Sequence, residues 1–176
     1  MTYWIFSHLN QPIRSATSSS DQFFKRLYLI TLLGSSSSLL ISSAYAEINP
    51  NALPSEGRIV AGQASITQQD ASLTVQQTSD KTIIDWQSFN VGKDAQVTFQ
   101  QPDIHAVALN RVITDNPSAI YGQLIANGQV FFVNPRGVLF APGSQVDVGG
   151  MVATTQNISN EDFLAGKNTF SRNGAQ

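Results

Sequence analysis

The sequence predicts an all-β protein in which short strands alternate with tight turns. Runs rich in Val, Ile, Phe and Thr follow one another between Ile59 and Thr154, and Gly, Asn, Asp, Pro or Ser separate them. No segment before Asn160 has the i, i+3, i+4, i+7 apolar spacing of an amphipathic helix. Some runs, such as Val130–Val133, are continuously apolar, which is typical of strands buried on both faces or under a cap. These observations favour a β-solenoid and leave a β-sandwich or barrel open.

The expected strands are short and lie closer together than the spacing of about 8–12 residues usual in sandwiches. From Gly122 onward the segments are loosely self-similar, which is the pattern of stacked coils. Asn160–Gly166 is expected to form a helical turn or two, capped by Asn160 and ended by Gly166. In chain order the strands are Ile59–Ala61, Ala64–Thr67, Ser72–Val75, Thr82–Trp86, Val97–Gln100, Ala106–Leu109, Ile120–Ile125, Val130–Val133, Val138–Phe140, Val146–Val148 and Met151–Thr154.

The clearest local signal is the stretch Ala126–Phe140, which places two apolar runs on either side of Asn134-Pro135-Arg136-Gly137. Proline fixes φ near about −65° at the second turn position, and glycine adopts a left-handed conformation at little steric cost. A second turn signal, Asn127-Gly128, precedes it. The stretch is therefore predicted as strand, tight turn and strand.

The composition limits the class of protein. Only 12% of the 176 residues are charged, against about 25% in ordinary soluble domains, so Gln, Asn, Ser and Thr must supply the polar surface. The net charge of −2 and the lack of a Lys/Arg cluster beyond the N-terminal region argue against a nucleic-acid partner. Because the chain has no cysteine, repeated hydrogen bonding and stacking must stabilise it in place of disulfides.

Residues 1–46 are predicted to be a signal peptide with a long n-region. Lys25-Arg26 precede the apolar run Leu27–Leu33, and a second short apolar run leads to Ala44 and Ala46, which form an A-x-A cleavage signal. The chain is therefore expected to be exported.

A transmembrane anchor is the alternative for this region. Gly34 and the four serines after it interrupt the apolar run, and no basic cluster follows, so the signal peptide is favoured. Residues 1–46 hold three of the ten Lys/Arg and one of the twelve Asp/Glu, which leaves residues 47–176 with a net charge of −4. Residues 47–176 are long enough for one domain.

No catalytic, cofactor or metal site is expected. His105 is the single histidine of residues 47–176 and follows a Pro-Asp turn, so a zinc site of the usual His/Cys kind lacks ligands. Asp85 and Asp147 lie on strand-like segments, while most other aspartates lie in turn-like contexts, which gives little support for a paired-carboxylate glycosidase. Trp86 and Phe89 are expected to pack in the core or a cap and not to stack on sugars.

Several motifs occur in a fixed order over residues 46–155. They are Leu53–Gly57 (LPSEG) before a Val/Ile-Ala-Gly strand, Ile84–Val91 (IDWQSFNV), Leu109–Val112 (LNRV), Asn116–Gly122 (NPSAIYG) and Ala126–Phe140. Together they resemble the N-terminal two-partner-secretion domain of filamentous-haemagglutinin-like exoproteins, also called the haemagglutination activity domain.

The resemblance implies a right-handed parallel β-helix with an N-terminal capping region, incomplete at its C-terminal end. It also implies a non-enzymatic role in secretion. The Sec machinery would deliver the chain to the periplasm, where the periplasmic domains of an outer-membrane barrel of the Omp85 class would recognise it. The chain would then fold at the cell surface or be released, as the front part of a longer exoprotein. Strand edges suit such recognition, because an extended segment can add to a partner's sheet.

The secretion motif of that family is Asn-Pro-Asn-Gly followed by Ile or Val, and it maps by resemblance onto Asn134, Pro135, Arg136, Gly137 and Val138. Arg136 replaces the second asparagine, so we expect the turn to persist and a side-chain amide contact to be lost. The family's second motif, Asn-Pro-Asn-Leu, has no counterpart; Asn49-Pro50-Asn51-Ala52 is similar but lies too early.

Two other functions remain as alternatives. One is an adhesin module that binds host or cell-surface glycans, which would depend on regions downstream of Gln176. The other is a β-helical polysaccharide-active enzyme, which would need a clustered acidic groove that the placement of the aspartates does not support.

Overall fold

Residues 48–172 are described by the structure, which is a computed structural model. They wind into a β-solenoid of about four turns, with α1 (Asn160–Leu164) as their one α-helix. Among these residues, no helix has both the length and the apolar character needed to cross a bilayer. The solenoid predicted from the strand and turn pattern is therefore confirmed, and the sandwich or barrel is not adopted. The predicted cleavage residues Ala44 and Ala46, and the whole of residues 1–46, lie outside the described range.

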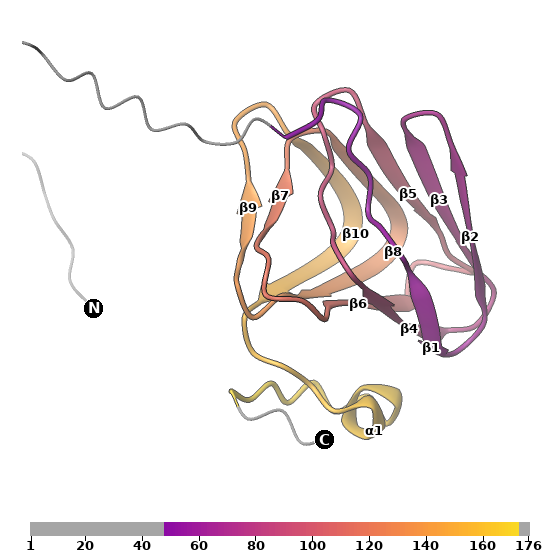
Figure 1. Cartoon of the computed structure of the whole chain (residues 1–176). Coiled ribbons are helices and arrows are strands. Elements are labelled where there is room, and N and C mark those ends of the chain that lie inside the picture. Colours follow the sequence, from indigo (N-terminus) through magenta and orange to yellow (C-terminus); the bar gives the residue numbers. More distant parts are fainter. Residues whose placement is uncertain (1–47, 173–176) are drawn as a thin grey trace, which may run out of the picture. The chain divides into compact units, whose positions relative to one another are not determined.

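Parallel pairing between successive coils builds three faces. Figure 1 shows the strands of the first face side by side, with β7 (Ser118–Ile120) and β9 (Val138–Phe140) forming a separate pair. The first face holds β3 (Ser72–Gln77), β5 (Gln96–Gln100) and the first parts of β8 (Gln123–Val133) and β10 (Gln145–Thr154). The second face holds β4 (Lys81–Trp86), β6 (Val107–Val112) and the later parts of β8 and β10. The third face holds Val91, β7 (Ser118–Ile120) and β9 (Val138–Phe140).

Within the coils the chain changes face at turns and glycines, and the one hairpin of consecutive strands among the described residues is β2 (Ala64–Gln69) with β3, at the N-terminal end. β8 pairs with β5 through residues 123–126 and with β6 through residues 129–133, so Asn127-Gly128 marks a corner. The register of β10 shifts between Val148 and Gly150 at the same corner one coil later. The predicted turn at Asn127-Gly128 is therefore a bend within one long strand.

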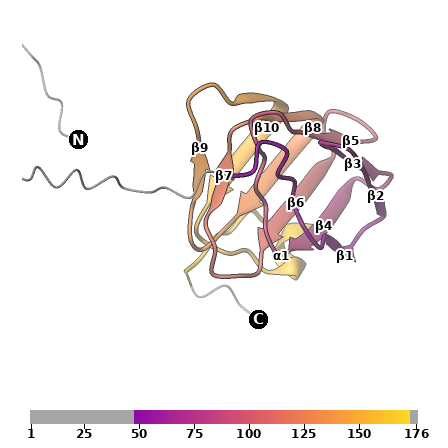
Figure 2. The same cartoon turned by 45° about the horizontal axis from the view of Figure 1, so that its top comes forward.

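An N-terminal cap covers the open edge of the first coil on all three faces. β1 (Arg58–Ala61) runs antiparallel to β4, and β2 (Ala64–Gln69) runs antiparallel to β3. On the third face the main-chain oxygens of Pro50 and Ala52 accept hydrogen bonds from Asp94 and Gly92. The predicted capping region is thus present, and it satisfies backbone groups that would otherwise form an exposed sheet edge. Figure 2 shows the colours running from indigo at β1 and β2 to yellow at β10 along the stack.

The interior of the solenoid is a narrow apolar stack that includes aromatic residues from several coils. Trp86 and Phe89 are each 1% exposed, and their rings meet edge to face at 5.4 Å. Phe89 packs in the same way on Phe132 at 4.6 Å. The prediction that Trp86 and Phe89 belong to the core is confirmed. The indole N–H of Trp86 donates to Asn110 Oδ1 at 2.9 Å, so the buried amide of Asn110 has a partner within the core.

A second apolar cluster lies on the outer side of the second face. The continuous run Val130–Val133 alternates between the two clusters: Val130 and Phe132 join the inner stack, and Phe131 and Val133 join the outer cluster. The outer cluster is covered by residues 157–171, which we call the C-terminal loop and which contain α1. The expectation that this run is buried on both sides is therefore confirmed.

Three local predictions are wrong in detail. The expected strand Ile120–Ile125 is interrupted at residues 121–122, because the corner between the third and first faces falls there. The two strands expected near the end of the sheet form one strand, β10, because its glycines bend without breaking the pairing with β8. The N-cap of α1 is Ser159, whose side chain accepts a hydrogen bond from Asp162 N, and Asn160 is the first helical residue. Gly166 follows the helix with φ of 77°, as expected of a terminating glycine.

Candidate functional site

The NPRG turn (Asn134–Gly137) connects β8 on the second face to β9 on the third. Gly137 N donates to Asn134 O at 2.9 Å, which closes a four-residue β-turn. The Oδ1 atom of Asn134 accepts a second bond, from Arg136 N at 2.9 Å, so an Asx turn reinforces the β-turn. Gly137 has φ of 93°, which confirms the left-handed glycine predicted from the sequence.

Asn134 is fully buried and joins three successive coils. Its Nδ2 donates to Asn116 O at 3.0 Å and to Ser118 Oγ at 2.9 Å, both in the coil before. Its backbone N–H donates to Thr154 O at 3.0 Å, at the end of β10 in the coil after. Each polar atom of this side chain is therefore occupied within the fold. Asn134 stabilises the stacking of corners and offers no free amide to a partner.

Arg136 fits the turn without strain and lies on the surface. Among the described residues the only positive φ values outside glycine belong to Glu56 and Asp70, so Arg136 has a negative φ and the turn is type I, with glycine at its fourth position. The guanidinium lies 3.2 Å from the carboxylate of Asp115, and both side chains are largely exposed. The expectation that the turn persists with arginine in place of asparagine is confirmed.

The strand after the turn has an unpaired edge and an apolar surface. β9 pairs with β7 on one side and has no strand on the other within the described residues. Leu139 and Phe140 are 53% and 36% exposed. An unpaired strand edge bearing apolar side chains can accept an added strand from another chain.

Two surface hollows flank the NPRG turn. One, of about 330 Å³, is lined by Pro135 together with residues of the second face and the corner before it, among them Asp85, Arg111 and Thr114. The other, of about 420 Å³, lies between Gly137-Val138 and the end of β10. The turn is thus a raised corner between two concave regions, and of its four residues Pro135 and Arg136 are the exposed ones.

A turn in the N-terminal cap repeats this geometry. In Asn49-Pro50-Asn51-Ala52, the Ala52 N–H donates to Asn49 O at 2.8 Å, and the Asn51 N–H donates to Asn49 Oδ1 at 2.9 Å. These are the two bonds of the NPRG turn, made by an Asn-Pro pair in the same positions. Asn49–Ala52, which lies too early in the sequence to be the family's second motif, therefore has the same hydrogen-bonding pattern as the NPRG turn.

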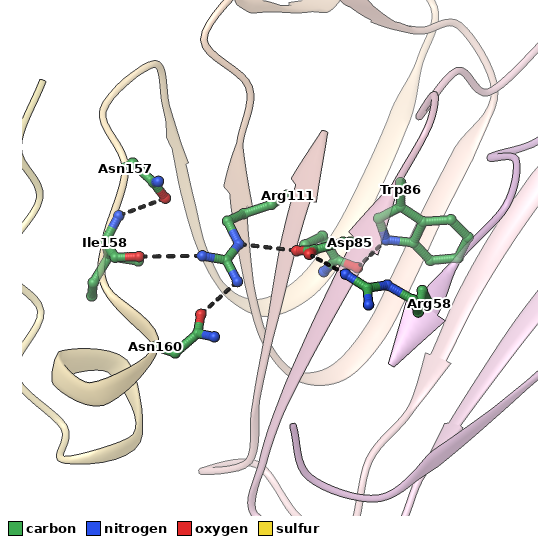
Figure 3. A network of polar contacts seen from close by, with 8 residues as sticks. Arg58, Asp85, Trp86, Arg111, Asn157, Ile158 and Asn160 are labelled. Carbon is green, nitrogen blue, oxygen red and sulfur yellow. Dashed lines mark hydrogen bonds and ion pairs between the residues drawn. The ribbon is translucent and has the colours of Figure 1, made fainter. Parts of the chain in front are cut away.

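An ion-pair network borders the first hollow, and Figure 3 shows it from close by. Asp85 on β4 lies between two arginines, with Arg111 Nε at 3.1 Å from Oδ1 and Arg58 NH2 at 3.5 Å from Oδ2. The three residues are register partners on β1, β4 and β6. Arg111 also donates to Ile158 O and Asn160 Oδ1 in the C-terminal loop. The network therefore links the N-terminal cap, two coils and the C-terminal loop.

The other sequence candidates do not form a catalytic or metal site. Asp85 is on a strand as predicted, but two guanidinium groups surround its carboxylate, and no second carboxylate pairs with it there. Asp147 is exposed on β10, and His105 is exposed on a loop where its N–H donates to Asp103 Oδ1. Among residues 48–172 no cluster of three His, Cys, Asp or Glu side chains is positioned to hold a metal ion.

Three functional contacts were missed by reading the sequence. The acceptors of the Asn134 amide, the partners of Arg111, and the outer apolar cluster all depend on which residues of successive coils lie side by side. The Leu109–Val112 segment (LNRV) was identified from the sequence as a motif, and two of its residues make such contacts: Asn110 accepts from Trp86, and Arg111 pairs with Asp85.

Comparison with known proteins finds one matching family and two similar relatives. The TPS secretion domain family matches residues 51–176. A heme/hemopexin-binding protein of Haemophilus influenzae is 44% identical over 106 residues, covering 60% of this chain and 11% of the relative. A second protein of that name, from H. influenzae strain KW20 Rd, is 38% identical over 122 residues, covering 68% of this chain and 14% of the relative. The chain thus spans only a small part of these relatives.

Among solved structures, the HMW1 secretion domain from H. influenzae superposes with a TM-score of 0.65 at 30% sequence identity. The match covers 68% of this chain and 32% of that structure. The family model and the structural comparison therefore both relate this chain to secretion domains.

Proposed function

Because this chain belongs to the family of TPS secretion domains, we propose that it directs the export of a longer exoprotein through the outer membrane. A TPS domain implies a partner transporter in that membrane, and exoproteins related to this chain are secreted or cell-surface proteins. The proposal is supported by the match of residues 51–176 to that family and by the NPRG turn, which we propose to be this chain's version of the family's secretion motif.

The partner is proposed to be a barrel of the Omp85 class, reached after the Sec machinery has carried the chain to the periplasm and residues 1–46 have been cleaved off as a signal peptide, after Ala46. Its periplasmic domains would add a strand to the segment that follows the turn, starting at Val138. Val138–Phe140 forms strand β9 in the folded solenoid, and this β-prone, apolar segment would be available for strand addition in the periplasm, before the chain folds.

Folding outside the cell is proposed to make export directional. Each coil buries a further layer of the apolar stack as it forms, so a chain emerging N-terminus first would resist sliding back. The N-terminal cap is consistent with this order of events, because its strands β1 and β2 pair only with strands of the first coil. Asn134 would then lock the corner of the third coil once residues 116–118 are in place.

Binding of glycans or haem is not proposed for this segment. Trp86 and Phe89, the aromatic residues best suited to stacking on a flat ligand, are buried in the core. The family that matches the chain is one of secretion domains, not of enzymes.

The test separates recognition from folding. The full chain is expressed with its partner barrel, and the amount in the medium is compared for wild type, Asn134→Ala, Gly137→Ala and Asp85→Asn. The last variant is a matched control, because it disturbs the folded state outside the motif. Loss of export in the two motif variants, with export of Asp85→Asn retained, supports recognition of the motif. A decrease in export that is proportional to the loss of stability in all three variants, whatever their position, would refute it.

A further inference from the structure

The C-terminal loop connects the beginning of the solenoid to its end. Its two ends are held together by a pair of backbone hydrogen bonds between Asn157 and Ser171, at 3.0 and 2.9 Å. Closure at this base makes a compact surface loop of the Ω type. From there the loop reaches back over the outer side of the second face, toward strands that precede it by up to 83 positions in the sequence.

Apolar packing holds this loop against three coils. Ile83, Leu109 and Phe131 are register partners on β4, β6 and β8 and form an outward-facing row. Phe163 of α1 and Ile158 are each 1% exposed and belong to the same cluster as this row. The rings of Phe131 and Phe163 meet edge to face at 6.0 Å. Docking of the loop therefore buries an apolar row that would otherwise face solvent.

Polar contacts fasten the loop to the first and second coils. Lys81 at the start of β4 donates through Nζ to the main-chain oxygens of Phe163 at 3.1 Å and Leu164 at 2.8 Å. These are carbonyls of the last turn of α1, where Phe163 O also accepts from Gly166 N at 3.0 Å. Arg111 donates to Ile158 O and Asn160, and through Asp85 it is connected to Arg58 in the N-terminal cap. A five-residue helix is not stable alone, so α1 depends on these strands.

We propose that the C-terminal loop is a coupling element that makes the described solenoid unfold as one cooperative unit. In an ordinary solenoid each coil contacts only its neighbours, so the terminal coils can fray independently. Here the loop that follows the last described coil binds the first coil directly, at Lys81 and Ile83. The stability of the first coil and that of the loop are therefore linked, and the linkage is reciprocal. The inference concerns the folded domain, so it stands or falls independently of the export proposal.

The test is amide hydrogen exchange on the full 176-residue chain under native conditions. Phe163→Ala removes the buried ring, and Leu164→Ala is the matched control, since Leu164 lies on the same helix but is 45% exposed. In Phe163→Ala, exchange of the slowest amides of β3 and β4 is expected to accelerate by about 100-fold or more, together with those of β6. Leu164→Ala is expected to change these rates by less than about threefold. Faster exchange confined to residues 157–171 would overturn the proposal.

Lys81→Met provides a second measurement from the other side of the interface, and it remains informative if Phe163→Ala does not fold. The substitution keeps the apolar stem of Lys81 and removes the two bonds to the loop. Exchange at Ala165 and Gly166, whose amides close the end of α1, is expected to accelerate by about tenfold, and β4 amides should accelerate in parallel. An unchanged loop in Lys81→Met would show that the two regions are not coupled.

Discussion

The side-chain amide of Asn134 donates to Ser118 Oγ at 2.9 Å and so joins the corner of one coil to β7 of the coil before it. Asn134 is 0% exposed and Ser118 is 1% exposed. The first residue of the proposed secretion motif is therefore part of the folded interior. A variant at this position changes folding as well as any recognition of the motif, so the two effects must be measured separately.

Replacing Asn134 with alanine is expected to destabilise the domain by about 2–3 kcal/mol. The change removes both Nδ2 bonds and the bond from Arg136 N, and it leaves the buried Ser118 Oγ without this partner, which alone costs about 1–3 kcal/mol. Urea unfolding measures the change in the free energy of unfolding. Arg136→Asn is the control, because the pair of Arg136 with Asp115 is exposed and should contribute less than about 1 kcal/mol. Equal losses in both variants would contradict the assignment of Asn134 as the structural residue.

Gly137→Ala is expected to cost about 1–2 kcal/mol for a purely backbone reason. A Cβ at Gly137 would have no atom within 4 Å, so no clash contributes, but φ is 93°. Residues with a Cβ pay about that much in a left-handed conformation, and asparagine adopts it more readily than alanine. Gly137→Asn should therefore lose less stability than Gly137→Ala in the same urea titration. If alanine is tolerated as well as asparagine, the positive φ does not govern this position.

Local sequence chemistry was sufficient to predict the turn but not its surroundings. Proline at the second position and glycine at the fourth determine the path of the backbone over four residues, so Asn134–Gly137 could be identified without any partner. Ser118 could not be identified as the acceptor, because its position beside Asn134 depends on the register between coils. A register shift of one residue would move each side chain of the strand to the opposite face. The run Val130–Val133 illustrates both cases: its burial on both sides was predictable, whereas the loop that buries Phe131 was not.

Asp85→Asn is expected to destabilise the domain by about 2–3 kcal/mol. The carboxylate is 12% exposed and lies between Arg58 and Arg111, so neutralising it leaves Arg111, with a side chain 15% exposed, without its opposite charge. Breaking a fully buried pair costs about 3–5 kcal/mol, and the partial exposure here reduces that figure. Thermal and urea unfolding both report the change.

Arg58→Ala serves as the comparison for this network. The Arg58 side chain is 75% exposed, so its removal should cost less than about 1 kcal/mol, and the cost should shrink further at high salt. A larger loss for Arg58 than for Asp85 would show that the cap, and not the β4–β6 pair, depends on this network.

Leu139→Asn is expected to reduce export several-fold while leaving stability within about 0.5 kcal/mol of wild type. Leu139 lies in the segment to which the proposed partner would add a strand before the chain folds, and in the folded solenoid it is 53% exposed on β9. Ile104→Asn is the matched control, because Ile104 is 66% exposed but lies on the loop before β6. The measurement is the rate at which each chain appears in the medium. Equal export of both variants would argue against β9 as the contact.

The most direct measurement compares the amount of wild-type chain released into the medium with and without the partner outer-membrane barrel. A secretion domain of this family should appear outside the cell only when the barrel is present, and should remain in the periplasm when it is absent. Equal release in both strains would contradict the proposal that this solenoid directs export through its partner.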